Sequence, residues 1–295
     1  MRHNKIIFLM INKIKSIYRF LSPKFQSIHL EYKVAPKPRY GHGLPPHRLL
    51  NEIIGKQRSR FVELLGSFRK YEKNLASILD SKDETNADNP TWNNEYLPGL
   101  DIIGLYGIVS EFKPRNYIEV GSGNSTKVAR KAIVENKLNT KIISIDPFPR
   151  ANIDHLSDEV IRMPFENLVD YKIIFDNLDV NDILFIDNSH RLFSNSDVMI
   201  FFLEILPYLK KGVIVHVHDI YLPYDYPQFM CDRFYNEQYM LAMAIIANPD
   251  KYEILLPNYF ISVDKELSST IEYIWSNENM KSAEKHGGSF WFRIK

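Results

Sequence analysis

The chain has 295 residues, of which 45% are hydrophobic and 25% charged, and its formal net charge is +1 at pH 7. This length allows one large domain, or one domain with an extension, and the composition is that of a globular protein with a sizeable core. The near-neutral charge argues neither for nucleic acid nor for an acidic partner. The single cysteine, Cys231, excludes a disulfide within the chain and fits a reducing, cytoplasmic setting.

The first thirty residues have a distinct charge pattern. They carry six basic side chains and no acidic one, and their apolar residues recur at helical spacing. The apolar run at 6–11 is too short to span a bilayer and no small-residue cleavage site follows it, so we expect neither a membrane-spanning helix nor a secretory signal. A basic amphipathic helix over 1–30 packs on its own domain or on a second copy of the chain, as in a homo-oligomer. The alternative is peripheral contact with the anionic inner face of a membrane.

A proline- and glycine-rich linker at 34–46 leads into a long helical pattern between His47 and Leu79. Residues 80–95 are polar and predict a surface loop. We therefore divide the chain into an N-terminal helical extension and linker, 1–95, and a domain that spans 96–295.

The domain alternates strands with helices. A first helix is expected at 100–112, before Pro114, and further helices at 125–135, 165–168, 196–209 and 234–247. The predicted strands are Tyr117–Val120, Lys141–Ile145, Glu159–Arg162, Ile183–Ile186, Val213–Val217, Tyr252–Leu256 and Ser289–Arg293. Apolar strands joined by helices predict an α/β fold with a doubly wound, mostly parallel sheet, and the last strand suits an antiparallel position near the sheet edge.

The junction between the first strand and its helix reads Glu119-Val120-Gly121-Ser122-Gly123-Asn124-Ser125. The glycines permit a sharp turn and the close approach of a ligand, and the helix N-terminus offers free N–H groups. The third glycine of a dinucleotide-binding turn is replaced by Thr126, and no Gly-Lys-Ser/Thr follows, so NAD, FAD and a nucleotide phosphate loop are disfavoured. Asp146 ends the next strand, where a carboxylate can hold the two hydroxyls of a ribose.

Two later strands also end in polar side chains. The fourth runs into Asp187-Asn188-Ser189-His190 and the fifth into His216-Val217-His218-Asp219. Because ligands bind at the carboxyl ends of the strands in a doubly wound sheet, we expect both loops to face the glycine turn. A histidine suits proton acceptance near neutral pH, so His190 is the first candidate for a catalytic base and His218 the second.

Together with Ser196-Asp197-Val198 and the loop at 223–227, these motifs resemble the class I S-adenosylmethionine-dependent methyltransferases. Within that family, the chain is similar to a bacterial branch akin to sugar and natural-product O-methyltransferases. The resemblance covers residues 95–295 and is loose before them. It implies a Rossmann-like sheet of seven strands in the order 3-2-1-4-5-7-6, with strand 7 antiparallel.

The resemblance implies S-adenosylmethionine as the cofactor, lying over the glycine turn. The cofactor-binding residues that it implies are Glu119, Gly121, Ser122, Gly123, Asn124, Ser125, Asp146, Pro164 and Phe165. In this assignment the methionine part passes over Gly121, Ser122 and Gly123, and Asp146 holds the ribose. Glu119 orients the turn or the amino group of the cofactor, and Pro164 and Phe165 lie near the adenine.

Some relatives hold a divalent ion with one acid after strand four and two acids after strand five. Asp187 and Asp219 match that pattern, whereas His218 stands in the place of an acid. Magnesium prefers oxygen ligands, so the imidazole favours manganese or iron, or no metal at all. The alternative for these residues is a helix cap and an acid–histidine hydrogen bond.

The resemblance thus implies O-methylation of a small molecule, sugar or glycan hydroxyl. The aromatic side chains of the loop at 221–226, Phe229 and Trp275 suggest an acceptor pocket, with ordinary core packing as the alternative. The alternative is a non-catalytic cofactor-binding or scaffold protein of the same fold. A short-chain dehydrogenase would need a Tyr-x-x-x-Lys pair after strand four, but Tyr208 is followed by Gly212. Nucleic acid is not expected as a partner, because the domain has no basic stripe.

Overall fold

The computed structural model describes residues 17–149, 152–280 and 282–295. The chain separates into two compact units, 1–36 and 37–295. In the first unit, residues 17–21 are helical, but the helix predicted over 1–30 falls mostly on residues 1–16, outside the described part. In the described part, no helix has the length and apolar character needed to cross a membrane.

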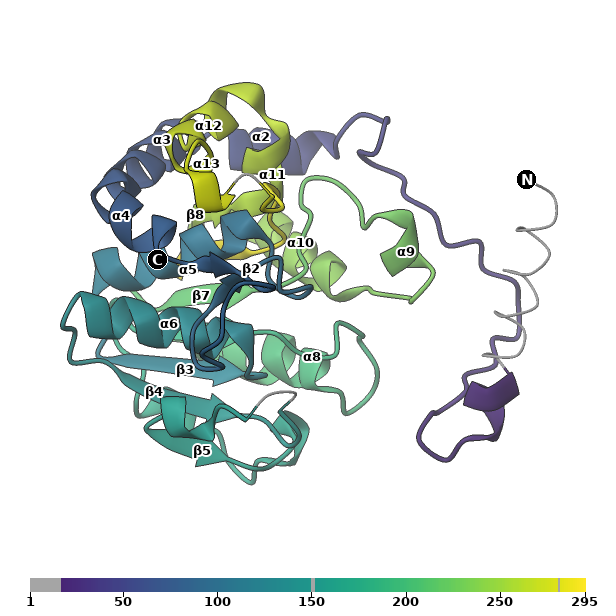
Figure 1. Ribbon diagram of the computed structural model, residues 1–295. Helices are drawn as coiled ribbons and strands as arrows, with labels where there is room; N and C mark the ends of the chain where they lie inside the picture. Colours follow the sequence, from purple (N-terminus) through teal and green to yellow (C-terminus); the bar gives the residue numbers. More distant parts are fainter. Residues whose placement is uncertain (1–16, 150–151, 281) are drawn as a thin grey trace, which may run out of the picture. The chain divides into compact units, whose positions relative to one another are not determined.

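The second unit is built on a seven-stranded sheet (Figure 1). Its strands are β3 (Asn116–Val120), β4 (Lys141–Ile145), β5 (Glu159–Ile161), β6 (Ile183–Ile186), β7 (Ile214–Val217), β8 (Tyr252–Pro257) and β9 (Phe290–Ile294). They are ordered β5-β4-β3-β6-β7-β9-β8, and β9 runs antiparallel to both of its neighbours. In chain order this is 3-2-1-4-5-7-6, which confirms the predicted topology.

The register of the parallel strands brings their carboxyl ends to one line. Val120 pairs with Ile145 on one side and with Ile186 on the other, and Ile186 pairs with Val217. The residues that follow these four ends therefore lie along one edge of the sheet. This alignment positions the candidate site.

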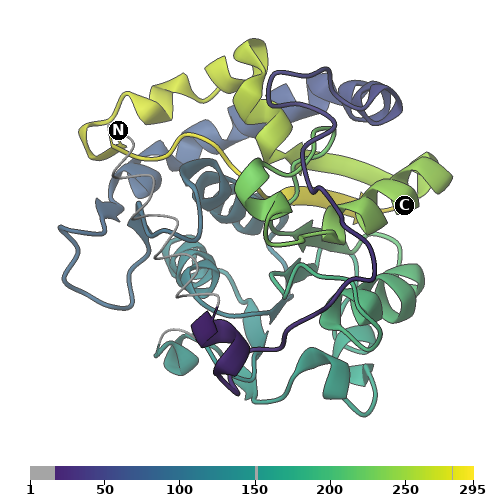
Figure 2. The same cartoon turned by 90° about the vertical axis from the view of Figure 1, so that its right-hand side faces the viewer.

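The helices of the domain are α5 (Gly99–Phe112), α6 (Asn124–Glu135), α7 (Lys172–Phe175), α8 (Asp197–Ile200), α9 (Gln228–Cys231), α10 (Glu237–Ala247), α11 (Asn258–Val263), α12 (Lys265–Ser269) and α13 (Glu272–Trp275). Figure 2 shows α5 and α6 on one side of the sheet and α8 and α10 on the other. The helix predicted at 196–209 is present but irregular, because a π-helical turn, Phe201–Ile205, follows α8 and a 3₁₀ turn, Leu206–Tyr208, closes it. The helix predicted at 234–247 begins only at Glu237, since Phe234 has a left-handed φ of 58°.

Residues 37–95 share the core of the domain. They form α2 (Arg48–Gly55), α3 (Arg58–Ser67), a 3₁₀ turn (Phe68–Tyr71), α4 (Glu72–Ala76) and the two short parallel strands β1 (Leu79–Asp80) and β2 (Thr91–Trp92). Phe68 is fully buried, and its ring fills the space that a side chain at Gly107 of α5 would occupy. These helices are thus packed on the domain, and a domain boundary at residue 95 stays a prediction.

Candidate active site

The turn after β3 requires glycine at its first position. Gly121 has a φ of 84°, which L side chains rarely adopt, and a Cβ there would overlap the carbonyl oxygen of Asp187. Its N–H donates to the carbonyl of Ile145 at 3.0 Å. The turn is therefore held between the ends of β4 and β6, where a ligand can approach its backbone.

Glu119 lies beneath this turn and is completely buried. Its Oε1 accepts hydrogen bonds of 2.6 Å from the hydroxyls of Thr126 and Ser144, and its Oε2 lies 3.4 Å from the Ser125 hydroxyl. Burial raises the pKa of Glu119 to about 7, although these hydroxyl donors favour the charged form. The side chain thus joins β3, β4 and the first turn of α6. These contacts fit the first of its two predicted roles, which is to orient the turn rather than the amino group of the cofactor.

Asp146, the first residue after β4, faces the same turn. Its Oδ2 accepts from the backbone N–H of Ser122 at 2.8 Å and from the Ser122 hydroxyl at 3.1 Å. Its Oδ1 accepts from the N–H of Phe148 at 2.8 Å. An ionised carboxylate has about four lone-pair positions, so these three donors leave one for a ribose hydroxyl, and a second hydroxyl would take the place of the Ser122 hydroxyl.

The other residues of the predicted cofactor site differ in how open they are. Gly123 and Asn124 stand at the start of α6, and nothing lies within 4 Å of a Cβ built on Gly123. Pro164 is half-buried at the start of a 3₁₀ turn, Phe165–Asn167. The Phe165 side chain is only 3% exposed and packs on Tyr171, so it offers backbone rather than ring surface to a ligand.

Four side chains from the ends of β6 and β7 converge beside the turn, and we call them the His–Asp cluster: Asp187, His190, His218 and Asp219. The Nε2 atom of His190 lies 3.5 Å from a carboxylate oxygen of Asp187 and 3.5 Å from one of Asp219. The Nδ1 atom of His218 lies 3.6 Å and 3.7 Å from the same two carboxylates. The side chain of Asp187 is 40% exposed, which makes it the most open member of the cluster.

Behind each histidine stands a buried acid that the sequence motifs did not identify. The Nδ1 atom of His190 lies 3.1 Å from Glu237 at the start of α10, and the Nε2 atom of His218 lies 3.4 Å from Asp101 in α5. Asp101 is itself held by the N–H groups of Gly288 and Ser289, at 2.8 and 2.9 Å. An acid within the otherwise apolar segment 99–109 was the signal that could have identified it.

These contacts determine the charges within the cluster. Burial opposes protonation of both histidines, but the carboxylates around them have the larger effect. They raise the pKa of His190, and they raise the pKa of His218 well above its ordinary value. Burial likewise opposes ionisation of Asp187, yet His218 and His190 lower its pKa. The acids and histidines of the described cluster therefore stabilise one another's charged forms.

Two members of the cluster have strained backbones. His190 has a φ of 60° and Asp219 a φ of 54°, both in the left-handed region that non-glycine residues rarely occupy. The carbonyl of His190 accepts from the N–H of Asn236, and the Asn236 side chain accepts from Leu192 N–H at 2.6 Å. Such strain, held in place by surrounding contacts, is typical of functional sites.

His216 proves to be a core residue rather than a site residue. It is completely buried, and its ring stacks on Phe185 with 3.7 Å between the ring centroids. Its Nε2 atom lies 2.7 Å from the hydroxyl oxygen of Ser289. Burial lowers its pKa well below the ordinary value.

The predicted metal ligands come together, but as partners of one another. In the part of the chain that the structure describes, no three His, Cys, Asp or Glu side chains are arranged, as they stand, to hold a metal ion. A metal bound by Asp187, His218 and Asp219 would have to open their ion pairs, and it stays a prediction.

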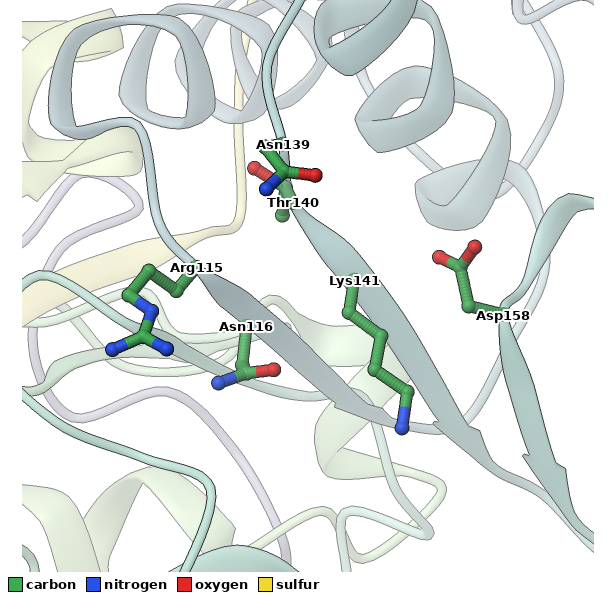
Figure 3. A pocket seen from close by; sticks show the side chains of 6 residues that line it. All are labelled: Arg115, Asn116, Asn139, Thr140, Lys141 and Asp158. Atoms are coloured by element: carbon green, nitrogen blue, oxygen red, sulfur yellow. The ribbon is translucent and has the colours of Figure 1, made fainter.

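A hollow lies at the opposite edge of the sheet, at the amino ends of the strands (Figure 3). It has a volume of about 440 Å³ and is lined at the amino ends of β3, β4 and β5 by Arg115, Asn116, Asn139, Thr140, Lys141 and Asp158. It contains no predicted site residue. Lys141 there pairs with Glu159 at 2.6 Å, and none of the residues that line the hollow belongs to the His–Asp cluster.

Comparison with known proteins agrees with this site. Residues 118–220 match the family model described as "Methyltransferase domain". This segment contains the glycine turn, Asp146 and the whole His–Asp cluster. The match and the strand order agree with the expected resemblance to the class I methyltransferases.

Several solved structures are similar to the chain, and no curated protein sequence matches it. The plantazolicin methyltransferase BpumL in complex with SAH is 14% identical, and the alignment covers 84% of this chain and 99% of that one with a TM-score of 0.41. The SAH-bound methyltransferase PaMTH1 of Podospora anserina is 14% identical, covering 87% and 100% with a TM-score of 0.40. The O-methyltransferase from Bacillus cereus in complex with SAH is 14% identical, covering 84% and 96% with a TM-score of 0.38.

Proposed function

We propose that this protein transfers a methyl group from S-adenosylmethionine to a hydroxyl of a small molecule, sugar or glycan. The observation that carries the proposal is the alignment of four strand ends at one edge of the sheet. It places the glycine turn and Asp146 next to a cluster that can accept a proton. A scaffold protein would have no need of this second feature, nor of its strained backbone.

The cofactor fits the residues around the turn. The backbone of Gly123 lies open to the methionine part, and Asp146 faces the turn where ribose hydroxyls would donate to it. A carboxylate here also repels a 2′-phosphate, which agrees with an adenosine that carries a free diol. Pro164 and the backbone of Phe165 complete the adenine side of this assignment.

When bound, the cofactor supplies an electrophilic methyl group on a sulfonium. That methyl group would pass to the acceptor oxygen, with the carbon–sulfur bond breaking as the carbon–oxygen bond forms and S-adenosylhomocysteine as the product. The chain's own contribution is to align the two reactants and to take the hydroxyl proton. We assign that proton to the Nε2 atom of His190, while Glu237 holds the other ring nitrogen and fixes the ring orientation.

His218 remains the second candidate base, but its surroundings favour a positioning role. Its side chain is 6% exposed, and its two ring nitrogens face Asp101 on one side and Asp187 and Asp219 on the other. It can therefore fix the two carboxylates that flank His190. Membrane contact and oligomerisation through residues 1–30, and a cytoplasmic location, stay predictions.

The proposal is tested by calorimetric titration with S-adenosylmethionine. We expect one site in the wild-type protein and an affinity about ten- to a hundredfold weaker in Asp146→Asn, because hydrogen bonds to a charged group contribute about 1.5–3 kcal/mol. Asp170→Asn, which changes an exposed acid outside the site, is the matched control and should bind as the wild type does. Equal affinities in all three proteins would remove Asp146 as the ribose ligand.

A further inference from the structure

Charge is distributed unevenly along the chain, although the whole molecule is nearly neutral. Residues 1–36, the first compact unit, hold seven of the 37 basic side chains and only one of the 36 acidic ones, Glu31. The formal charge of this unit is therefore +6, and that of residues 37–295 is −5. Such an asymmetry is typical of a chain whose basic part binds an anionic surface.

The described part of this unit is also rich in exposed apolar side chains. Nine of the eighteen residues from 17 to 34 are large and apolar, and each of them is between 46% and 74% exposed. They are Ile17, Tyr18, Phe20, Leu21, Phe25, Ile28, Leu30, Tyr32 and Val34. Single exposed apolar residues are ordinary on a protein surface, whereas a dense group of them marks an interaction surface.

Contacts within this segment cover little of its apolar surface. After the helical residues 17–21, the N–H of Phe25 donates to the carbonyl of Ser22 at 3.1 Å. This turn brings the Phe25 ring to 6.2 Å from the Tyr18 ring, and the Arg19 guanidinium lies 6.0 Å from the centroid of the Phe25 ring. Tyr18 and Phe25 are nevertheless 59% and 49% exposed. A unit of this length is too short to bury nine large side chains in a core of its own.

The charge of the unit distinguishes the partners that could cover this surface. A second copy of the chain would bring another charge of +6 to the same place, and like charges oppose such pairing. The domain has the opposite charge, but residues 1–36 form a compact unit of their own. An anionic membrane supplies both features that the segment lacks, because it has an apolar layer beneath a layer of negative head groups. Four of the nine apolar side chains are aromatic, a type favoured at the boundary between these layers.

The backbone of the segment suits contact with a membrane surface rather than entry into the bilayer core. In the described ranges, no helix is long and apolar enough to cross a membrane. Residues 25–34 form neither helix nor strand. Backbone groups without partners are costly in hydrocarbon, so this segment belongs in the hydrated head-group region, where its side chains can still reach apolar chains.

We propose that residues 17–34 bind the surface of anionic membranes. The apolar side chains of this segment enter the boundary between head groups and acyl chains, and the exposed side chains of Arg19, Lys24 and Lys33 lie at the negative head groups. This contact holds the domain at the membrane without a spanning helix. The proposal is independent of the proposed function, because no predicted site residue lies in this unit.

Co-sedimentation of the full-length protein with vesicles tests the proposal. One set of vesicles is phosphatidylcholine alone, and the other holds phosphatidylcholine and phosphatidylglycerol in equal parts. We expect binding to the anionic vesicles to be more than about tenfold tighter, and to weaken at high salt, where the Debye length falls to about 3 Å. The triple variant Arg19→Gln, Lys24→Gln, Lys33→Gln should weaken it about a hundredfold, because each basic residue near the surface strengthens binding about fivefold.

A matched control removes the same charge from the domain. The triple variant Lys56→Gln, Lys210→Gln, Lys265→Gln changes exposed lysines outside the unit and should bind as the wild type does. Phe20→Ser with Phe25→Ser should weaken binding more than about tenfold, because it removes two large apolar side chains. Absence of binding to the anionic vesicles, equal binding to both kinds of vesicle, or an equal loss in the two triple variants would overturn the proposal.

Two measurements without vesicles identify the other occupants. Light scattering that shows a dimer in the wild type and a monomer in the Phe20→Ser, Phe25→Ser variant would assign the surface to a second copy of the chain. Urea denaturation in which the same variant lowers the free energy of unfolding would assign it to the domain. Either result, in place of vesicle binding, would refute the membrane contact, and unchanged mass and unfolding beside lost vesicle binding would support it.

Discussion

At the scale of single residues, the site depends on acids placed where they cannot be solvated. Glu119 is fully buried and is held by three hydroxyl groups rather than by a cation. Asp101 and Glu237 are equally buried, but each faces a histidine. Burial without a cation raises the pKa of Glu119, whereas the acids around His190 and His218 raise the pKa of these two histidines and make them stronger proton acceptors. Buried acids thus have two uses here: Glu119 supports the glycine turn, and Asp101 and Glu237 favour the charged forms of the histidines beside them.

Glu119 gives a prediction about stability and pH. Its pKa rises from an ordinary value of 4.5 to about 7 in the folded chain, so the folded state holds this proton more tightly than the unfolded state does. Its contribution is fully present below pH 4.5 and is lost as the pH rises through 7, a change of about 3 kcal/mol in the free energy of unfolding. Urea denaturation between pH 4.5 and 8 should therefore show this loss in the wild type and not in Glu119→Gln. Glu63→Gln, at an exposed position of α3, should retain it, and parallel curves for all three proteins would contradict the assignment.

His190 gives a prediction about catalysis. His190→Gln keeps a polar side chain beside Glu237 but removes the proton acceptor, so turnover should fall about 10²- to 10⁴-fold. The affinity for S-adenosylmethionine should stay within about threefold, because the ring faces the acceptor side. Methyl transfer from the labelled cofactor to a panel of hydroxylated rings measures the first effect and calorimetry the second. His155→Gln, an exposed histidine paired with Asp88, is the control; normal turnover of His190→Gln would remove this residue as the base.

At the scale of elements, the site is a property of strand ends. The site is made from the segments that follow four strands, β3, β4, β6 and β7. These segments are far apart in sequence, and the parallel register of the strands brings them together. The glycine turn and the end of β6 are in direct contact, because a side chain at Gly121 would overlap the Asp187 backbone. Cofactor turn and cluster are therefore expected to move as one unit.

The two loops after β6 and β7 also carry the metal prediction. An ion at Asp187, His218 and Asp219 would replace the present ion pairs, and the imidazole suits manganese or iron better than magnesium. On that prediction, a chelator abolishes turnover, and Mn²⁺ or Fe²⁺ restores it more fully than Mg²⁺. Elemental analysis of the purified protein should then find about one ion per chain. Full turnover by protein shown to be free of metal would leave the cluster as a set of ion pairs.

At the scale of the whole molecule, the sequence predicted the sheet, its order and its edge, because apolar strands and the glycine turn are local signals. It could not predict that residues 48–76 pack into the same core, since contacts such as Phe68 on Gly107 join distant segments. The site residues at the strand ends were predictable too, because each directly follows a strand that local signals identify. The partners of the two histidines were harder to predict, because Asp101 and Glu237 reach them from helices far away in sequence, and only Asp101 is marked, as an acid in an apolar segment.

The central claim is that the glycine turn and the His–Asp cluster form one methyl-transfer site. A crystal structure of the full-length protein with S-adenosylhomocysteine tests it most directly. We expect the ribose hydroxyls on Asp146, the methionine part over Gly121 and Gly123, and the sulfur facing the cluster. A cofactor bound elsewhere, or one whose sulfur points away from His190 and Asp187, would contradict this claim.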